Sequence, residues 1–460
     1  MSVLSDDIKA KWLFGSTVPF AEPAWARGCP SPYYNDSHRR LRAAMRSWVD
    51  ENLMPHTLEL ESSAVLPDSL YEKAAKDGLI MPMASGARIP QEWRGKYPII
   101  GNVSPEEWDG FHDLVIHDEF GRVGGIGIEN GLVGGAVLSV PALQKYGSQH
   151  IKDIIIPSIL SGRSRIALAI TEPGAGSDVQ GVQTEAKVSS DGSHFIVDGE
   201  KKWITSGMYA HYFLTMVREA TGEFTLLVIP RTDGLTTKHI TLSGSTAAGT
   251  AFVDFENVKV PMNMVVGERG QGLKYVMSNF NHEVGASALS LKTVANVKQR
   301  LFIGMQALRC ARVCLEDSIS HAMNRETFGK KLVDHPVLRL KIANMSRETE
   351  ALQAWSLIYQ ISQLSSEESV FLLAGTTGQL KAHAGIVLEY VVREAIQIMG
   401  GIGLTRGGRG ERVERIWRDV KAITIPGGSE EILLEFATRR ALNVTAQLRA
   451  EEAKVGKNKL

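Results

Sequence analysis

The hydrophobic periodicity of this chain changes twice, and the two changes divide it into three zones. After an irregular, proline-containing start, residues 1–164 have a mostly helical pattern, in which Leu41 and Met45, for example, share one face. Over residues 165–272 short β-type runs alternate with turn signals, and helical periodicity returns over 273–460. We therefore expect a multidomain α+β chain with an N-terminal helical domain, a middle β-barrel or sheet domain and a C-terminal helical bundle.

One turn in the middle zone has a specific signal. Asp198-Gly199 stands between two β-type runs, and this dipeptide favours a tight hairpin turn. The sequence therefore predicts a hairpin at this position.

Composition excludes several classes of protein. The 51 basic and 51 acidic residues cancel, so no broad electrostatic surface for nucleic acid is expected. The three cysteines cannot form a disulfide framework, which favours a reducing compartment. No apolar run is long enough for a transmembrane segment, and no secretory signal is recognised at the amino terminus.

The common cofactor and nucleophile signatures are missing. There is no GxGxxG after a strand, no GxxxxGK[ST], no HExxH, no CxxC and no GxSxG, so we expect neither a Rossmann domain, nor a serine hydrolase, nor a metal site. Cys310 and Cys314 are four residues apart, which fits core packing on one helical face.

Two segments of the middle zone carry residues suited to a flat, phosphorylated ligand. In "LAITEPGAGSDVQG", backbone amides beside the glycines can approach a ligand closely, and the hydroxyls of Thr171 and Ser177 can bond to it. In "GEKKWITSG", the Trp203 ring lies near the hydroxyl of Thr205, a combination that suits a heterocycle. Composition alone leaves a polar turn and a surface tryptophan as the alternative interpretation.

Together these segments resemble the acyl-CoA dehydrogenase family of flavoproteins. Three later segments agree in order: "NRETFGKKLVDHP", "QIMGGIGLTR" and "WRDVKAITIPGGSEEI". The resemblance covers roughly residues 36–445, and the helical, sheet and helical order is the architecture of that family.

The resemblance implies an FAD site. Trp203 would cover the flavin face away from the substrate, Thr205 would lie near the reactive ring nitrogen, and Ser177 would bond the pyrophosphate. A second group would hold the diphosphate and adenosine, partly across a subunit interface, although Pro336 after His335 removes a donor that relatives often have there. The remaining implied cofactor residues are Leu168, Ala169, Ile170 and Thr171 at the ring edge, and Arg325, Thr327, Phe328, Gln397, Gly400, Gly401 and Ser429.

The catalytic base is the point at which this chain departs from the common family pattern. Many relatives carry the glutamate in a loop that aligns with "PGGSEEI", where this chain has Gly427, whose backbone N–H could still polarise a thioester carbonyl. Relatives such as the isovaleryl-CoA and long-chain enzymes supply the glutamate from a helix, and "SNFNHE" matches that place and ends in Glu283. Glu283 is the predicted base; Glu430 or Glu431, and the absence of a competent base, remain the alternatives. The neighbouring His282 is expected to be structural.

Residues 284–299 interrupt the family pattern directly after Glu283. Sixteen residues add four turns and about 160° to a helix, so the segment must loop out or the site is disturbed. The segment could also be a translated intron, because its first and last codons and an internal Ala-Asn pair are compatible with splice signals. Intact peptides spanning residues 286–298 would contradict that explanation.

We therefore predict an FAD-dependent enzyme that converts an acyl-CoA to the trans-2-enoyl-CoA. The alternatives are an acyl-CoA oxidase-like enzyme that passes electrons to oxygen, or a relative that binds flavin or acyl-CoA without catalysis. The expected partners are acyl-CoA, an electron acceptor (electron-transfer flavoprotein or oxygen) and further copies in a homodimer or homotetramer. The terminal Asn458-Lys459-Leu460 resembles a peroxisomal address; otherwise a mitochondrial or cytoplasmic location is expected.

Overall fold

The N-terminal domain is helical. The computed structural model describes residue 9 and residues 13–280, 294–362 and 367–457. In α2 the buried residues, among them Leu41, Met45 and Trp48, follow the predicted helical face. The helices are α2 (Asp36–Asn52), α3 (Thr57–Ser62), α4 (Asp68–Lys76), α5 (Ile80–Ser85), α6 (Gly110–Phe120), α7 (Gly127–Glu129), α8 (Gly135–Tyr146) and α9 (Ile156–Leu160).

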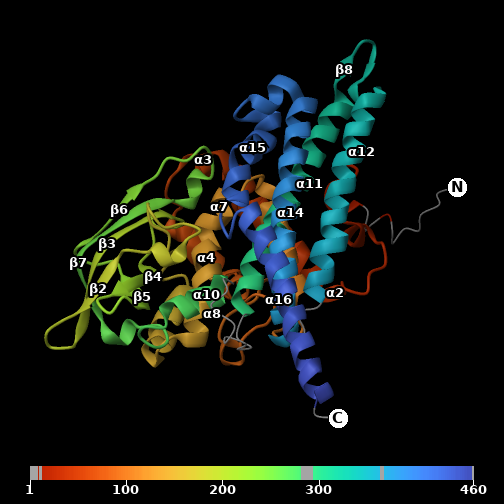
Figure 1. The fold of residues 1–460 in the computed structure, drawn as a ribbon. Helices are drawn as coiled ribbons and strands as arrows, with labels where there is room; N and C mark the ends of the chain where they lie inside the picture. The colour runs from red at the N-terminus through yellow and green to blue at the C-terminus, as the bar shows by residue number, and fades with distance from the viewer. Residues whose placement is uncertain (1–8, 10–12, 281–293, 363–366, 458–460) are drawn as a thin grey trace.

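The middle domain is a seven-stranded sheet in the order β1-β4-β2-β3-β7-β6, with β5 paired to β4. β1 and β2 run parallel to β4, and the other pairs are antiparallel. Figure 1 shows the sheet standing to one side of the helical body. The strands are β1 (Ile166–Ala169), β2 (Glu185–Val188), β3 (His194–Ile204), β4 (Tyr212–Glu219), β5 (Phe224–Pro230), β6 (Leu235–His239) and β7 (Ala251–Pro261).

The predicted hairpin at Asp198-Gly199 is wrong. β3 runs straight through this dipeptide, and the register against β7 shifts between Val197 and Gly199. The glycine is needed for a close approach, because a Cβ at Gly199 would lie 2.7 Å from the Cα of Thr184, and its φ is +137°. A bulge and a hairpin turn use the same small residue, and the local sequence does not distinguish them.

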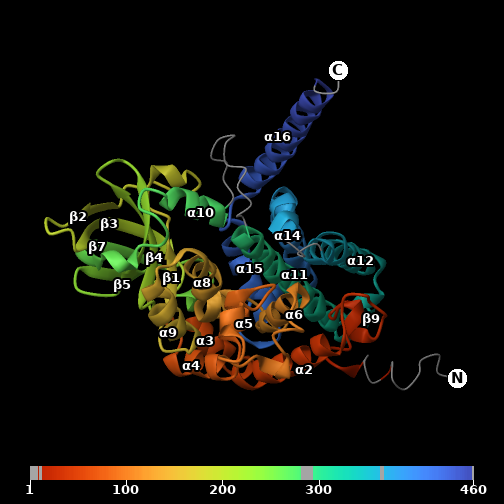
Figure 2. The same ribbon diagram turned by 90° about the horizontal axis from the view of Figure 1, so that it is seen from below.

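The C-terminal domain is a bundle of long helices. α11 packs along α14, and α14 packs against α15 and α16. The short hairpin β8–β9 stands at the far end of α11 and α12, and α16 extends from the opposite end, as Figures 1 and 2 show. The elements are α10 (Gly272–Phe280), α11 (Val294–Asn324), β8 (Glu326–Thr327), β9 (Lys330–Lys331), α12 (Pro336–Ala351), α13 (Tyr359–Ser362), α14 (Glu367–Met399), α15 (Glu411–Thr424) and α16 (Glu430–Lys457).

One continuous hydrophobic core runs through all three domains, from Trp25 to Ile423. Cys310 and Cys314 are both buried in it, as predicted. Burial raises the pKa of the Cys310 thiol, so this sulfur packs as an apolar atom rather than as a thiolate. Within the described residues, no helix is long and apolar enough to cross a membrane.

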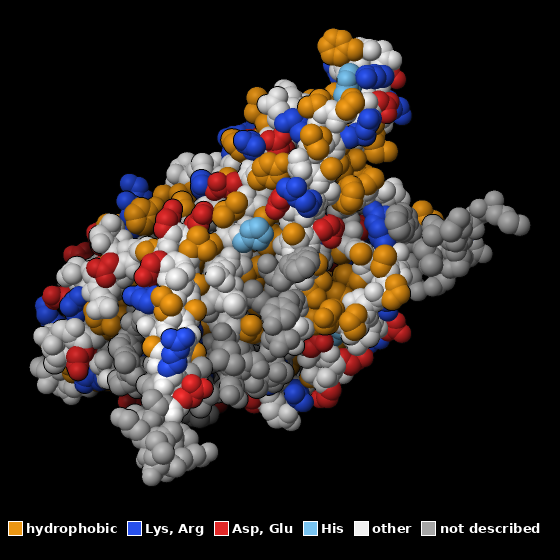
Figure 3. All heavy atoms as spheres, turned by 45° about the vertical axis from the view of Figure 1, so that its right-hand side comes forward, with side chains coloured by type: hydrophobic (Ala, Val, Ile, Leu, Met, Phe, Trp, Pro, Cys, Tyr) orange, Lys and Arg blue, Asp and Glu red, His pale blue; other side chains and the backbone are white. Residues whose placement is uncertain are grey.

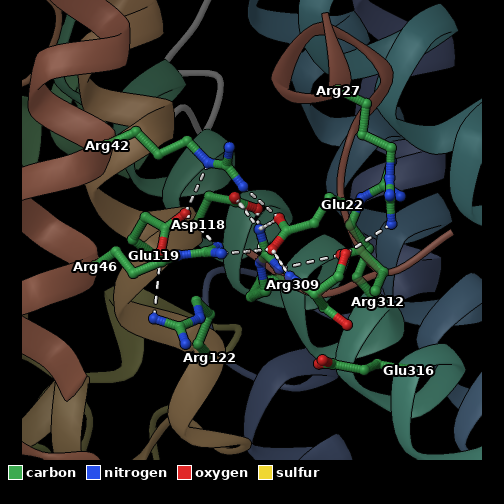
Figure 4. Close-up of polar contacts among 12 residues, drawn as sticks. Glu22, Arg27, Arg42, Arg46, Asp118, Glu119, Arg122, Arg309, Arg312 and Glu316 are labelled. Atoms are coloured by element: carbon green, nitrogen blue, oxygen red, sulfur yellow. Dashed lines mark hydrogen bonds and ion pairs between the residues drawn. The ribbon is translucent and has the colours of Figure 1, made fainter. Parts of the chain in front are cut away.

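A buried network of charges fastens the N-terminal segment to this core (Figure 4). Glu22, from that segment, accepts from Arg42 and Arg46 of α2 at 2.6 and 2.7 Å. Glu119 of α6 accepts from the same two guanidinium groups. Burial works to raise the pKa of Glu22, but Arg309 and the two α2 arginines outweigh it and hold the pKa well below its usual range. The segment is therefore held by ionised, paired groups.

Candidate active site

The two segments expected to hold the flavin meet in the middle domain. "LAITEPGAGSD" begins in β1 and continues into a loop, whereas "KKWI" forms the end of β3. The backbone N–H of Lys202 donates to the carbonyl oxygen of Thr171 at 2.9 Å. This bond places the residues that follow β1 beside the residues around Trp203.

A buried ion pair that sequence reasoning missed holds the two segments together. Lys201 is fully buried, and its Nζ donates to Oε1 of Glu172 at 2.8 Å and to the carbonyl oxygens of Ile170 and Met216 at 3.0 and 2.8 Å. Glu172 also accepts from the backbone N–H and the hydroxyl of Thr184. Burial lowers the pKa of Lys201 to about 8, although Glu172 opposes the shift. The ammonium therefore remains charged at neutral pH.

Trp203 presents its ring to the outside of the domain. The side chain is 47% exposed and the backbone has a φ of +59°, which is unusual for an aromatic residue. The register of β3 against β7 shifts between Lys201 and Ile204, which interrupts the strand alternation. As a result Lys201 and Ile204 are buried, whereas the Trp203 ring is exposed and Nζ of Lys202 lies 4.8 Å from its centroid. Thr205, directly after the strand, is half-buried.

The surroundings of Trp203 fit the group that the resemblance implies. Ser177 is exposed, and a Cβ added at Gly174 or Gly176 would meet nothing within 4 Å, so the loop backbone is open to a ligand. Leu168 and Thr171 are partly exposed, whereas the side chains of the other two predicted ring-edge residues, Ala169 and Ile170, are buried in the core. Those two could contact a flavin only through their backbone.

The predicted diphosphate and adenosine residues lie elsewhere. Figures 1 and 2 show the β8–β9 hairpin, which contains Thr327, at the end of the bundle remote from the sheet. There, Arg325 and Phe328 are exposed, the latter to 95%, and Oγ1 of Thr327 lies 3.2 Å from Nε2 of His335. Within one chain, Arg325, Thr327 and Phe328 therefore do not lie beside Trp203. Gln397, Gly400 and Gly401 are exposed at the end of α14 and in the 3-10 turn that follows it.

The loop that would carry the base in many relatives lies between α15 and α16. Gly427 has a φ of +74°, and a Cβ there would lie 2.7 Å from Cδ1 of Ile303 on α11. Ser429 is half-buried beside the start of α16, and Glu430 and Glu431 are exposed in the first turn of that helix. Neither carboxylate is held in a buried position.

The predicted base, Glu283, lies outside the described residues, and so do His282 and residues 284–293 of the insertion. α10 ends at Phe280, and α11 begins at Val294, so the last six residues of the 284–299 insertion belong to α11. The terminal tripeptide 458–460 also lies outside the described part of the chain.

A second buried polar chain, also missed from sequence, links α6 to the region after Trp203. His117 lies 2.6 Å from Oε1 of Glu129. Gln306 of α11 donates to both Glu129 and Asn130 at 2.9 Å, and the Ser206 hydroxyl donates to the Asn130 carbonyl oxygen at 3.2 Å. This series of hydrogen bonds links residues of all three domains, and it ends at Ser206, three residues after Trp203.

Replacing His117 with glutamine should make stability respond differently to pH. Burial works to lower the pKa of His117, but its bonds to Asp113 and Glu129 outweigh burial and raise the pKa to about 9. The folded pKa is above that of the unfolded chain, so the stabilisation is complete below about pH 6.5 and lost as the pH rises to about 9. Unfolding of both proteins at pH 6 and pH 9.5 should show a wild-type advantage of up to about 3 kcal/mol that shrinks at the higher pH. An advantage independent of pH would contradict this.

The cluster of His38, Asp109 and His112 has the composition of a metal site, but its bonds are those of helix caps. Nδ1 of His38 accepts from the backbone N–H of Asn35, and Nδ1 of His112 accepts from that of Asp109. Nε2 of His38 lies 3.1 Å from Asp109, and Nε2 of His112 lies 2.9 Å from Ser37. These two capping boxes interlock the starts of α2 and α6.

Three family models match the chain in order. They are the acyl-CoA dehydrogenase N-terminal domain over residues 35–163, the middle domain over 167–258 and the C-terminal domain over 270–442. Together with the fold, they define a flavin-dependent oxidoreductase. The chain belongs to the acyl-CoA dehydrogenase family, which confirms the resemblance; it acts on acyl-CoA, and its cofactor is FAD.

Fungal and bacterial proteins are similar over nearly the whole length. Acyl-CoA dehydrogenase apdG of Emericella nidulans is 38% identical over 97% of this chain and 99% of its own. Acyl-CoA dehydrogenase AFT10-1 of Alternaria alternata is 36% identical over 93% and 96%. A crystal structure of a putative acyl-CoA dehydrogenase from Mycobacterium smegmatis superimposes with a TM-score of 0.76 at 27% identity, covering 89% of this chain and 99% of that one.

Replacing Trp203 with alanine should weaken flavin retention. The exposed indole offers an aromatic face to a flat heterocycle, and stacking of this kind contributes about 0.5–1.5 kcal/mol beyond buried area. We expect the variant to lose a large part of its FAD during gel filtration, measured as the ratio of absorbance at 450 and 280 nm. Val188→Ala, which truncates an exposed apolar strand residue, is the matched control. Unchanged flavin content in Trp203→Ala would contradict the placement.

Proposed function

We propose that this protein catalyses FAD-dependent α,β-dehydrogenation of an acyl-CoA thioester to the trans-2-enoyl-CoA. The observation that supports this most directly is the bond from Lys202 to Thr171, which sets an open loop beside the exposed ring of Trp203. This surface suits a flavin ring whose other face is left to the substrate. The bound FAD would supply a two-electron acceptor for the hydride leaving the β carbon.

In this proposal Glu283 removes the proton from the α carbon. The N–H of Gly427 donates to the thioester oxygen, where negative charge develops as that proton leaves. Exclusion of water around the carboxylate would raise its pKa and make it a stronger base. Both roles are carried over from family-matched positions, and Gly427 has no side chain of its own to act as base.

The test is anaerobic bleaching of the bound flavin by a panel of acyl-CoAs. A dehydrogenase loses its 450 nm absorbance with at least one member of the panel and forms the enoyl thioester. Oxygen consumption on admitting air, at the rate of turnover, would instead favour the oxidase-like alternative. If no member of the panel bleaches a fully loaded protein, the non-catalytic alternative replaces the proposal.

We also propose that the working protein is a homodimer or homotetramer. The hairpin with Arg325 and Phe328 lies remote from the sheet of its own chain, so it could reach a flavin only on a neighbouring subunit. Figure 3 shows hydrophobic side chains gathered along the upright helices beside this hairpin. Val337 and Leu340 of α12, the helix that follows the hairpin, are exposed to 59% and 63%.

Sedimentation of the FAD-loaded protein should therefore give a multiple of the 50.3 kDa chain mass. Phe328→Ala should lower flavin content without unfolding the chain, because the ring packs against little within its own subunit. A 50 kDa monomer carrying a full complement of flavin would refute both expectations.

The terminal Asn458-Lys459-Leu460 supports a further proposal, import into peroxisomes. A fluorescent protein ending in residues 451–460 should become punctate in cells and should stay diffuse when Leu460 is removed. A diffuse signal from the intact tail would contradict it.

A further inference from the structure

A fully enclosed lysine lies beneath the loop that contains Gly427. Lys381 is in the middle of α14 and is 2% exposed. Its Nζ donates to the carbonyl oxygen of Gly428 at 2.7 Å and to that of Thr424. Thr424 and Gly428 flank residues 425–427, so the Lys381 side chain hydrogen-bonds to both ends of the loop.

The loop itself has little intrinsic rigidity. Gly427 and Gly428 follow one another with φ values of +74° and +103°, a conformation that glycine adopts readily but does not enforce. Ile425 and Pro426 before them are exposed. Holding such a segment in one conformation costs backbone entropy, so a bond from a rigid helix is needed to maintain it.

The lysine retains its charge in this position. Burial and the neighbouring Arg300 lower its pKa to about 8, so the ammonium form, with three donors, predominates at neutral pH. Arg300 itself donates to the Ala374 carbonyl oxygen at 2.9 Å and stacks over the ring of Phe436. An ammonium buried beside a guanidinium is unfavourable unless its donors are well satisfied, which the two loop carbonyls achieve.

We propose that Lys381 is a positioning residue for the acyl thioester: it clamps both ends of the Thr424–Gly428 loop and thereby aims the N–H of Gly427 at the thioester oxygen. This inference rests on the proposed function, because it assigns a task to the loop in that reaction. Ile303 of α11 packs close to the loop, because a Cβ added at Gly427 would lie 2.7 Å from its Cδ1. Lys381 thus orients the loop, and the backbone N–H of Gly427 is the hydrogen-bond donor.

The experiment compares FAD-loaded wild-type protein with Lys381→Met, which matches the side-chain length but removes every donor. Lys381→Gln keeps two donors and covers the case in which the methionine variant does not fold. Lys421→Met is the matched control, because this exposed lysine on α15 is close to the loop in sequence but pairs with Glu389 instead.

The first measurement is amide hydrogen exchange of peptides covering residues 424–429, which needs no substrate. We expect exchange to be at least about 10-fold faster in Lys381→Met, with Lys381→Gln between it and wild type. The second is flavin reduction by an acyl-CoA that bleaches the wild type. Its rate constant should fall about 10- to 100-fold while FAD content and acyl-CoA affinity stay near wild type. The carbonyl stretch of a bound, isotope-labelled enoyl-CoA should shift back toward its value in water.

Wild-type exchange at residues 424–429 in Lys381→Met overturns the clamp, whatever the enzyme does. Faster exchange with an unchanged reduction rate and carbonyl stretch overturns the positioning role. Failure of the wild type to bleach with any acyl-CoA counts against the proposed function, and the exchange comparison still decides whether the clamp exists.

Discussion

Lys201→Met should destabilise the middle domain by about 3–5 kcal/mol, because it leaves the buried carboxylate of Glu172 without its cation. The two carbonyls that Nζ bonds, those of Ile170 and Met216, lose their donor as well. Ile170 directly precedes Thr171, so we also expect loss of FAD. Thermal unfolding and flavin content measure the two effects.

Lys187→Met is the control for that variant, since it removes an exposed strand lysine that pairs with the exposed Glu185 and should leave stability nearly unchanged. A double variant that also carries Glu172→Gln should recover part of the loss, because no buried charge then remains unpaired. A Lys201→Met protein as stable as wild type and fully loaded with FAD would show that the ion pair does not hold the two segments together.

Glu283→Gln should reduce the rate of flavin reduction by acyl-CoA about 100- to 10,000-fold, the range lost when a general base is removed. The substitution keeps the side-chain shape, so FAD should stay bound. Anaerobic stopped-flow measurement of the 450 nm absorbance gives the rate. Glu430→Gln and Glu431→Gln, at exposed positions in α16, should leave it unchanged.

If instead Glu283→Gln reduces flavin at the wild-type rate, the base is elsewhere, and a loss in Glu430→Gln or Glu431→Gln would identify it. Removal of residues 284–299 should restore or raise activity if the insertion is spurious, because Arg300 then follows Glu283 directly. Peptide masses across residues 280–305 decide independently whether the insertion is present in the natural protein.

The architecture could be predicted from periodicity because each domain is uniform in type. The positions of Trp203 and Thr171 could be predicted only through the family resemblance. The burial of Lys201 could not be predicted from the local sequence. Regular strand alternation would place Lys201 on the same face as Trp203, but the bulge after Lys201 puts the two side chains in different environments. A bulge depends on the register against β7, about fifty residues further along the chain, and no local pattern encodes it.

The polar chain through His117 and Gln306 was missed for a related reason. His117, Glu129 and Gln306 lie on α6, α7 and α11, Glu129 and its partner Gln306 are 177 residues apart, and each of the three looks like an ordinary helical side chain by itself. Their partnership arises only when the domains pack. The charge network around Glu22 is similar, because Glu22 precedes the matched N-terminal domain while its partners lie on two helices of different domains, Arg42 and Arg46 on α2 and Arg309 on α11.

That network bears on how the protein can be shortened. The matched N-terminal domain begins at residue 35, so trimming the chain to this boundary would delete Glu22 while Arg42, Arg46 and Arg309 stayed in the interior. The three guanidinium groups would keep the carboxylates of Glu119 and Asp118 but lose that of Glu22, so an excess of positive charge would remain in a region that the deleted segment no longer covers. The residues ahead of residue 35 thus supply a counter-charge for the folded body, and a chain begun at the boundary of the matched domain would lack it.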